Sequence, residues 1–244
     1  MKRRIIPTKS LARAMVLGGL STIIAGCATP HGEQAAPLAT VLPARGAANL
    51  TSTGFYVDDA GHVLTAGHAV GGCRRIVVAS NGQPQEAAVI ARSQKKDLAL
   101  LKVERSLGAA AVFAREVDVE RPGLVFAAGY QDLPQLLAEG GALSNAVLRS
   151  GRESRAASGD IELISDASFG TSGAPVLASS GLAIGVVTHK KASGQVFAVH
   201  ADPAKEFLRA QGVLVREDDR PRLTVWQDRA SFAARMSVTV HCAR

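Results

Sequence analysis

Short β-forming runs recur between residues 50 and 200 and are separated by glycines and other turn residues. Strands of this length, spaced about 8–12 residues apart, are typical of barrels and sandwiches, so the pattern predicts an all-β fold. The expected strands are Thr51–Val57, His62–Thr65, Arg75–Ala79, Glu86–Ala91, Leu98–Val103, Leu124–Ala128, Ala142–Arg149, Ile161–Ile164, Pro175–Leu177, Leu182–Val187 and Gln195–Val199.

One segment after these runs has the signals of a helix. Pro203–Gln211 follows Asp202, which is a good capping residue, and Pro203 suits a first helical turn. Gly212 is a typical stop signal. The sequence therefore predicts a short helix near the C-terminus.

Composition limits the functions that such a chain can have. Hydrophobic residues make up 47% and charged residues 20%, which is enough apolar material for a buried core. Aromatic residues make up only 4%, which argues against a base-stacking surface and hence against a nucleic-acid partner. No apolar run approaches the roughly 18 residues that a membrane-spanning helix needs.

The net charge of +7 comes mostly from the first 26 residues. That segment contains five of the 28 basic residues and no acidic one, so the remainder has 23 basic against 21 acidic residues, a net charge of +2. A cationic stretch followed by the apolar Ala14–Ala25 is typical of a secretory signal peptide. An N-terminal anchor helix is the weaker alternative.

The run Ile24-Ala25-Gly26-Cys27 closes this leader and resembles the lipobox of bacterial lipoproteins. The resemblance implies that Cys27 is acylated and tethers the protein to a membrane, because several acyl chains hold a soluble domain at a surface. Ala28 at the following position implies the outer membrane of the cell envelope, facing the periplasm. Residues 27–48, rich in Ala, Pro and Gly, are expected to form a flexible tether.

Two further cysteines remain, Cys73 and Cys242. An exported protein experiences an oxidising compartment, so the two thiols are a candidate disulfide that would pin the C-terminus. Two buried free thiols are the alternative.

Three short segments carry candidate chemistry. His68 follows the small residues of Leu64-Thr65-Ala66-Gly67, Asp97 precedes the apolar run Leu98–Val103, and Ser172 lies between the glycines of Gly170-Thr171-Ser172-Gly173. Each alone has an ordinary interpretation: a solvated histidine, an aspartate capping a turn, or a glycine turn. Glycines around the serine also allow tight turns that aim backbone N–H groups at one point.

Taken together, the order His68, Asp97, Ser172 is that of the chymotrypsin-type triad. Over roughly residues 50–210 the chain resembles the trypsin-like serine proteases, and most closely the HtrA/Deg branch. The resemblance implies two six-stranded antiparallel β-barrels with a short C-terminal helix, in a protease domain at 49–215 with an extension at 216–244. Modest departures from the family pattern are Gly67, Thr171 and Ala174, none of which removes a catalytic atom.

The resemblance also implies a mechanism and a role for each residue. Ser172 would attack the scissile carbonyl while His68 accepts its proton, and Asp97 would orient the imidazole. The backbone N–H groups of Gly170 and Ser172 would form the oxyanion hole.

Substrate recognition is expected on the strand after the nucleophile, where Val187, Thr188 and His189 would pair with an extended peptide. Asp166 lies six residues before Ser172. It is either an acid that selects Lys or Arg in the S1 pocket or a structural residue at a strand end. Glutamyl endopeptidases have a histidine at the position of Val187, which argues against cleavage after Glu.

The sequence has no His-Glu-x-x-His run, no paired-cysteine zinc spacing and no Walker loop, so no metal or cofactor is expected. The leading interpretation is a lipid-anchored serine endopeptidase that acts on polypeptides. A catalytically silent, protease-like binding or scaffold lipoprotein and an ester hydrolase using the same residues are the alternatives. Residues 216–244 are too few for the PDZ domain of HtrA proteins, and we expect them to pack across the second barrel. The oligomeric state stays open.

Overall fold

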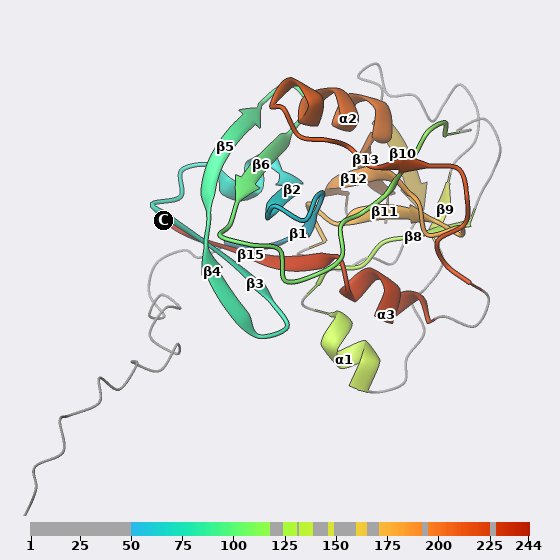
Figure 1. Ribbon diagram of the computed structural model, residues 1–244, viewed down its shortest axis with the longest axis horizontal. Coiled ribbons are helices and arrows are strands. Elements are labelled where there is room, and N and C mark those ends of the chain that lie inside the picture. Colours follow the sequence, from blue (N-terminus) through green and yellow to red (C-terminus); the bar gives the residue numbers. More distant parts are fainter. Residues whose placement is uncertain are drawn as a thin grey trace, which may run out of the picture. The chain divides into compact units, whose positions relative to one another are not determined.

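The computed structural model describes residues 50–117, 124–130, 132–138, 146–148, 160–164, 171–191, 195–224 and 228–244. All of them belong to the compact unit Pro37–Arg244. Two β-sheets dominate this unit, and Figure 1 shows them side by side with helices packed around them. Among the described residues, no helix is both long enough and apolar enough to cross a bilayer.

The first sheet curls into a barrel. Its order is β4-β3-β15-β1-β2-β6-β5, and every pairing in it is antiparallel. Only Ala87 separates β4 from β5, and its N–H donates to Ile76 O at 3.0 Å, so 83–93 is one bent strand that pairs with β3 and then with β6. This bend closes a ring of six strand positions. The strands are β1 (Leu50–Tyr56), β2 (His62–Ala66), β3 (Arg75–Ser80), β4 (Gln83–Glu86), β5 (Ala88–Ser93), β6 (Leu98–Lys102) and β15 (Ser237–Ala243).

The second sheet closes by a direct pairing. Six antiparallel strands follow the order β11-β8-β9-β10-β13-β12, and β12 pairs back onto β11. Two short strands, β7 and β14, extend this sheet in parallel beside β12. The fold expected from the sequence, two six-stranded barrels, is confirmed. The strands are β7 (Phe113–Ala114), β8 (Leu124–Phe126), β9 (Ala146–Leu148), β10 (Asp160–Ile164), β11 (Pro175–Ala178), β12 (Ala183–Lys190), β13 (Gln195–His200) and β14 (Glu217–Asp218).

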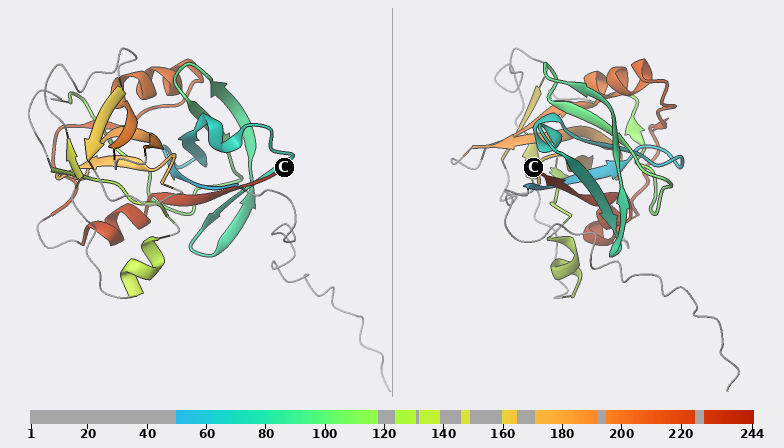
Figure 2. Two further views of the ribbon diagram at one scale, coloured as in Figure 1. Left: turned by 180° about the vertical axis from the view of Figure 1, so that it is seen from behind. Right: turned by 90° about the vertical axis from the view of Figure 1, so that its left-hand side faces the viewer.

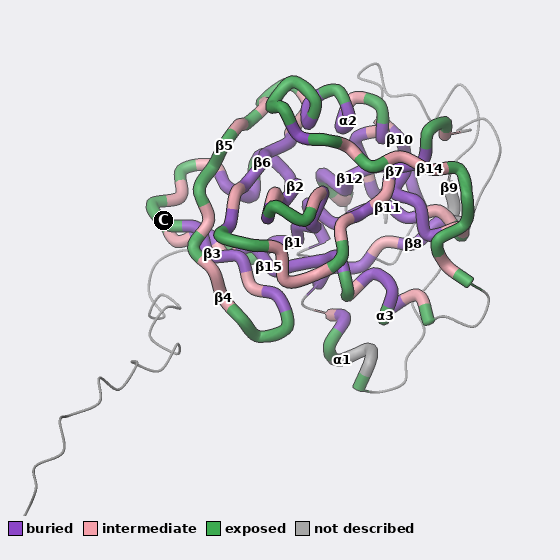
Figure 3. The backbone as a smooth tube through the Cα atoms, in the orientation of Figure 1, coloured by how far each residue is buried: buried purple, intermediate pink, exposed green. Residues whose placement is uncertain are grey.

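Among the described residues, three clusters of buried apolar side chains hold the unit together. Figure 3 shows buried residues along the strands of both sheets. One fills the first barrel around Tyr56 and Leu101, and another fills the second around Leu163 and Val176. The largest joins the barrels, because residues of the first sheet such as Leu64 share it with residues of the second. Burial of this shared cluster fixes the two barrels against each other.

The C-terminal segment does not pack where the sequence analysis placed it. Strand β15 lies in the first barrel, between β1 and β3, so the expectation that the tail crosses the second barrel is wrong for this strand. Its buried face, including Val238 and Val240, completes the core of the first barrel, which is the physical reason for its position. Only β14, from the same segment, joins the second sheet.

Three helices cover the sheets: α1 (Leu133–Ala138), α2 (Ala201–Ala210) and α3 (Arg229–Ala234). Figure 2 shows α2 on one side of the unit, with α1 and α3 together on another. Helix α2 is the one predicted from the sequence, and Gly212 follows it with φ +76°. Its capping residue differs, because the His200 ring accepts the Asp202 N–H at 3.1 Å while the Asp202 carboxylate binds Lys205 at 2.9 Å.

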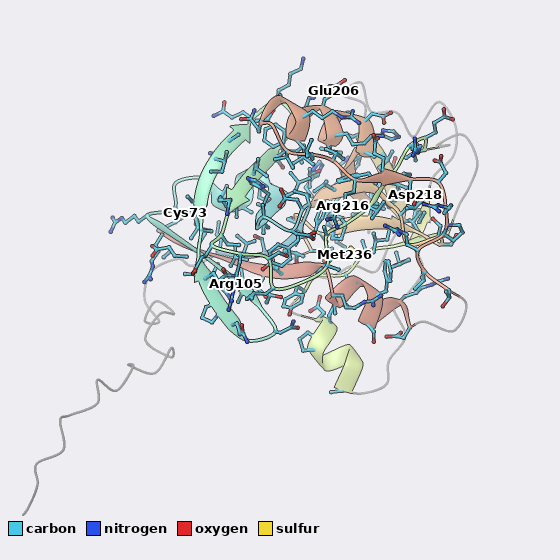
Figure 4. The ribbon with its side chains drawn as sticks, in the orientation of Figure 1. Cys73, Arg105, Glu206, Arg216, Asp218 and Met236 are labelled. Atoms are coloured by element: carbon cyan, nitrogen blue, oxygen red, sulfur yellow. A yellow bond between two sulfur atoms is a disulfide. The ribbon has the colours of Figure 1, made fainter. Side chains whose placement is uncertain are left out.

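Ion pairs connect the segment that follows α2 to the helix itself and to the first barrel. Lys205 is buried, and its Nζ donates to the carbonyls of Ala114 and Arg115 at 3.0 Å and contacts Glu217 Oε1 at 2.8 Å. Hydrogen bonding to Lys205 lowers the pKa of Glu217. Nearby, Arg216 binds Asp59 in the turn between β1 and β2 (Figure 4). The charged segment after α2 therefore ties the two barrels together.

Candidate active site

His68 lies in a short 3₁₀ helix, Gly67–Val70, directly after β2. The Gly67 N–H donates to Asp97 O at 2.8 Å, and a Cβ at Gly67 would come within 3.1 Å of Asp97 atoms. The small residue before His68 thus lets this turn lie against the segment that carries Asp97.

Asp97 precedes β6 and adopts φ +48°, a left-handed conformation that is uncommon for a residue with a side chain. Its Oδ1 accepts the backbone N–H of His68 at 2.8 Å, and its Oδ2 lies 2.8 Å from His68 Nδ1. A carboxylate beside Nδ1 favours the tautomer with a proton on that nitrogen, which leaves Nε2 as an acceptor. The geometry orients the His68 ring through both its backbone N–H and Nδ1.

Ser172 lies in a tight turn of the second barrel. The Ala174 N–H closes the turn on Thr171 O at 2.8 Å, and Gly173 has φ +87°, which favours glycine. The carbonyl of Ser172 accepts the Thr53 N–H from β1 of the first barrel at 2.9 Å. The turn is therefore anchored to the barrel that carries His68.

The Ser172 hydroxyl donates to the carbonyl of Thr188 at 2.8 Å. A hydroxyl has one proton, so in this conformation Ser172 does not donate to His68. Thr188 is the extra residue of a β-bulge, because the pairing of β12 with β13 shifts register between Val187 and His189. Bulges re-aim backbone groups next to functional sites, and this one directs a carbonyl toward Ser172.

The comparisons with known proteins agree with this arrangement. Residues 52–186, more than half of the chain, match the family model of the trypsin-like peptidase domain. The chain belongs to the trypsin-like peptidase family.

Related sequences of this trypsin-like peptidase include HtrA proteins. Serine protease HTRA1 of Xenopus tropicalis is 31% identical over 163 residues, which are 65% of this chain and 35% of that protein. An uncharacterized protein, y4bJ, of Sinorhizobium fredii is 36% identical over 165 residues, 66% of this chain and 25% of that protein. The chain thus spans a quarter to about a third of the length of these relatives.

Solved structures show the same fold. The Rv3671c protease in an inactive form superposes with a TM-score of 0.53 at 25% identity, covering 67% of this chain and 85% of that one. The HtrA-type protease AlgW, solved with a decapeptide, gives 0.54 at 20% identity, covering 66% of this chain and 51% of that one. The resemblance to HtrA-type trypsin-like peptidases that the motifs indicated is confirmed.

The register of β12 decides where the main-chain groups of the residues predicted to contact substrate are directed. Val187 cannot offer its main chain to a peptide, because its N–H donates to Ala174 O and its carbonyl accepts the Gly173 N–H. Lys191 N donates to Gln195 O, and peptide groups alternate in direction along a strand, so the main chain of Lys190 is directed away from β13. The Thr188 carbonyl therefore faces Ser172, and the main chain of Lys190 faces away from β13.

His189 presents its side chain on the outer face of the second barrel. Its ring stacks on Phe197, with ring centroids 4.6 Å apart, and Lys191 Nζ lies 4.6 Å from the centre of the same Phe197 ring. His189 is exposed next to Thr188, so its side chain borders the edge on which a peptide would lie.

Other predicted residues lie outside the described residues: Asp166, Gly170 and Cys27. The oxyanion hole, the S1 pocket and the lipid anchor therefore stay predictions. Within the described ranges, no cluster of three or more His, Cys, Asp or Glu side chains could hold a metal ion.

Cys73 and Cys242 form a disulfide with their Cα atoms 5.3 Å apart. Cys73 follows the short helix of His68, and Cys242 is buried in β15 opposite Leu50, the first residue of β1 (Figure 4). The bridge therefore ties the last strand to the segment after His68, while strand pairing places Cys242 beside the beginning of β1.

The sequence analysis missed three residues around the Ser172 turn: Thr53, Thr65 and Tyr130. The Thr65 hydroxyl donates to Thr53 O at 2.7 Å, and the Tyr130 N–H donates to Thr53 Oγ1 at 3.0 Å. Threonines are common in strands, so nothing in the sequence distinguishes these two.

Proposed function

We propose that the protein is a serine endopeptidase in which Ser172 is the nucleophile, His68 the general base and Asp97 the residue that orients the imidazole. The observation that carries the proposal is the double contact of Asp97 with the backbone N–H and Nδ1 of His68. It supports an imidazole whose Nε2 can accept a proton from an alcohol.

In the acylation step, Ser172 Oγ forms a bond to the scissile carbonyl carbon while its proton passes to His68 Nε2. His68 then gives that proton to the leaving amine as the C–N bond breaks, and Asp97 stabilises the transient imidazolium without taking the proton. Water attacks the acyl-enzyme by the same route and releases the carboxylic acid product.

Attack requires the Ser172 hydroxyl to leave Thr188 O and turn toward His68. Rotation about χ1 moves a serine hydroxyl between staggered positions, and the proposal requires one of these positions to face His68. The carbonyl of Thr188 is then open to a peptide N–H of the substrate, which fits β-strand addition along β12. A polypeptide is therefore the proposed substrate.

The negative charge that develops on the carbonyl oxygen needs hydrogen-bond donors. We assign this role to the backbone N–H groups of Gly170 and Ser172, as the family motif implies. Loss of one such donor typically costs roughly 3 kcal/mol of transition-state stabilisation.

Activity-based labelling tests the proposal. A fluorophosphonate probe should label the wild type and should not label Ser172→Ala, and casein zymography should show clearing that His68→Ala loses. His62→Ala is a matched control, because His62 also contacts an aspartate, Asp58, yet has no proposed catalytic role. Equal clearing by wild type and His68→Ala, or none by either, would favour a silent binding or scaffold protein.

We further propose that the protein is exported and anchored by acylation of Cys27, on the periplasmic side of the outer membrane. The Cys73–Cys242 disulfide supports an oxidising compartment. Metabolic labelling with an alkyne-bearing palmitate should mark the wild type and not Cys27→Ser, and the wild type should sediment with outer-membrane vesicles. Equal labelling of both proteins would contradict the anchor.

A further inference from the structure

Thr53 is a fully buried residue of β1 at the junction of the two barrels, and three of its polar groups bind other segments. Its N–H donates to Ser172 O at 2.9 Å, its carbonyl accepts the Thr65 hydroxyl at 2.7 Å, and its Oγ1 accepts the Tyr130 N–H at 3.0 Å. One residue thus connects β2, the turn of the nucleophile and the segment after β8.

Gly173 packs very closely against Thr53 and Thr65 at this junction. A Cβ added to Gly173 would lie 2.0 Å from Thr53 O and 2.4 Å from Thr65 Oγ1, far inside van der Waals contact. The α-carbon of Gly173 therefore rests directly on the Thr53–Thr65 hydrogen bond. Any movement of that bond has to displace the peptide that carries Ser172.

The hydrogen bond between Thr65 and Thr53 also connects the Ser172 turn to the segment that carries His68. Thr65 is the fourth residue of β2, and His68 follows three residues later, in the short helix that continues the strand. Thr65 is fully buried, so water does not replace its hydrogen bond to Thr53 if the hydroxyl is removed. The strand that carries the base and the turn that carries the nucleophile thus meet at one buried hydroxyl.

We infer that Thr65 and Thr53 are positioning residues, which set the separation of His68 and Ser172 across the barrel junction. The inference rests on the proposed function. Neither residue contacts the reacting atoms: they act through the backbone of Ser172. A small displacement of a reacting group from its productive geometry can cost up to about a hundredfold in rate, so loss of this bond should be visible in catalysis.

Tyr130 extends the connection to the far side of the first barrel. Its hydroxyl accepts the Asn81 N–H at 2.8 Å, in the turn between β3 and β4. Thr53 Oγ1 therefore accepts a hydrogen bond from the main chain of Tyr130, whose ring hydroxyl is bound in turn by Asn81. Loss of Oγ1 in Thr53→Val should have a smaller effect than loss of the Thr65 hydroxyl, because Thr53→Val keeps the bond from Thr65 Oγ1 to Thr53 O against which Gly173 packs.

The experiment compares Thr65→Val, Thr65→Ser and Thr53→Val in the full chain, at a temperature well below unfolding. For Thr65→Val we expect the second-order rate of fluorophosphonate labelling and kcat to fall about tenfold, with KM within twofold of wild type. Thr65→Ser keeps the hydroxyl and should stay within threefold of wild type. The pH profile of labelling should not shift, because the contacts of Asp97 with His68 are untouched.

Ser52→Ala is the matched control. Ser52 is the buried neighbour of Thr53 in β1, and its hydroxyl donates to a carbonyl of β15 rather than to β2. We expect labelling within twofold of wild type. If Thr65→Val does not fold, Thr65→Ala against Thr65→Ser isolates the same hydroxyl, and a tenfold ratio between them is the expected result.

Labelling of folded Thr65→Val within twofold of wild type would overturn the inference, as would an equal loss in Thr65→Ser or Ser52→Ala. These outcomes are separate from a failure of the proposed function, in which the wild type itself is not labelled or Ser172→Ala is labelled as well. In that second case the inference falls together with the proposed function.

Discussion

The first barrel contains two histidine–aspartate pairs with the same hydrogen-bond pattern. In each, one carboxylate oxygen accepts the backbone N–H of the histidine and the other faces Nδ1: Asp58 does so for His62, at 3.0 and 2.5 Å, and Asp97 for His68, at 2.8 and 2.8 Å. The His62–Asp58 pair is local, four residues apart in a turn, whereas 29 residues separate Asp97 from His68.

The two pairs differ in what surrounds them. The His68 and Asp97 side chains are 49% and 35% exposed, against 23% and 18% for His62 and Asp58. A histidine–aspartate contact is therefore no catalytic signature by itself, and access to solvent distinguishes one pair from the other.

Replacing each aspartate by asparagine tests most directly whether the two pairs differ in function. For Asp97→Asn we expect labelling and proteolysis to fall about 10³- to 10⁴-fold, because an amide no longer holds the required imidazole tautomer. For Asp58→Asn we expect activity within twofold of wild type and a loss of less than about 1 kcal/mol in unfolding free energy. Labelling kinetics and thermal unfolding of both variants check this, and comparable activity losses would remove the distinction.

A second prediction concerns the fit of the Ser172 turn against the first barrel. Gly173→Ala would place a Cβ 2.0 Å from Thr53 O at φ +87°, so we expect a destabilisation of about 4 kcal/mol together with loss of activity. Gly82→Ala, at φ +75° with no atom within 4 Å of the added Cβ, should cost only about 1 kcal/mol. Denaturant unfolding measures both, and similar values would show that no close fit exists at Ser172.

The disulfide allows a third test, because it ties β15 to the segment that follows His68 and not to the turn of His62. Replacing both cysteines by serine should lower the unfolding free energy by about 3 kcal/mol, mainly because the unfolded chain loses a long cross-link. A reductant should shift the melting temperature of the wild type and not that of the double variant. Two titratable thiols in the untreated protein would contradict the bridge.

The smallest expected effect lies at Glu217, which belongs to neither pair. Contact with Lys205 lowers the pKa of this carboxyl in the folded state, so the stabilisation is present above its ordinary value of 4.5 and is lost as the pH falls through the folded pKa. Glu217→Gln should therefore differ from wild type by about 1 kcal/mol or less at pH 7 and should converge with it in acid. Unfolding free energies of both proteins, measured from pH 7 to pH 3, check this pH dependence. A difference between the two proteins that grows in acid would contradict the prediction.

The sequence was most informative where the pattern is local. Strands with an apolar face, such as β1, β2 and β6, lie close to their expected ranges, and Gly212 follows α2 as expected. Strand β4 was missed because Gln83-Pro84-Gln85-Glu86 is polar and contains a proline, which is typical of a turn. Strands β7 and β14 have two residues each, too few for any period to be visible.

Features that depend on contacts between residues distant in the sequence could not be predicted from local patterns. Strand β15 was not among the expected strands, and its place between β1 and β3 depends on which core it completes. The bulge at Thr188 directs its carbonyl toward Ser172, and no residue type in the sequence predicts a bulge there. The order of His68, Asp97 and Ser172 identified the candidate site, whereas Thr53 and Thr65 became visible only through their contacts.

Peptide mapping of the fluorophosphonate adduct tests the central claim most directly. The wild-type protein is labelled, digested and sequenced by mass spectrometry. We expect one modified residue, Ser172, with no adduct on that peptide in the Asp97→Asn protein after the same labelling time. An adduct on another serine, or no adduct on a folded wild-type protein, would contradict the account.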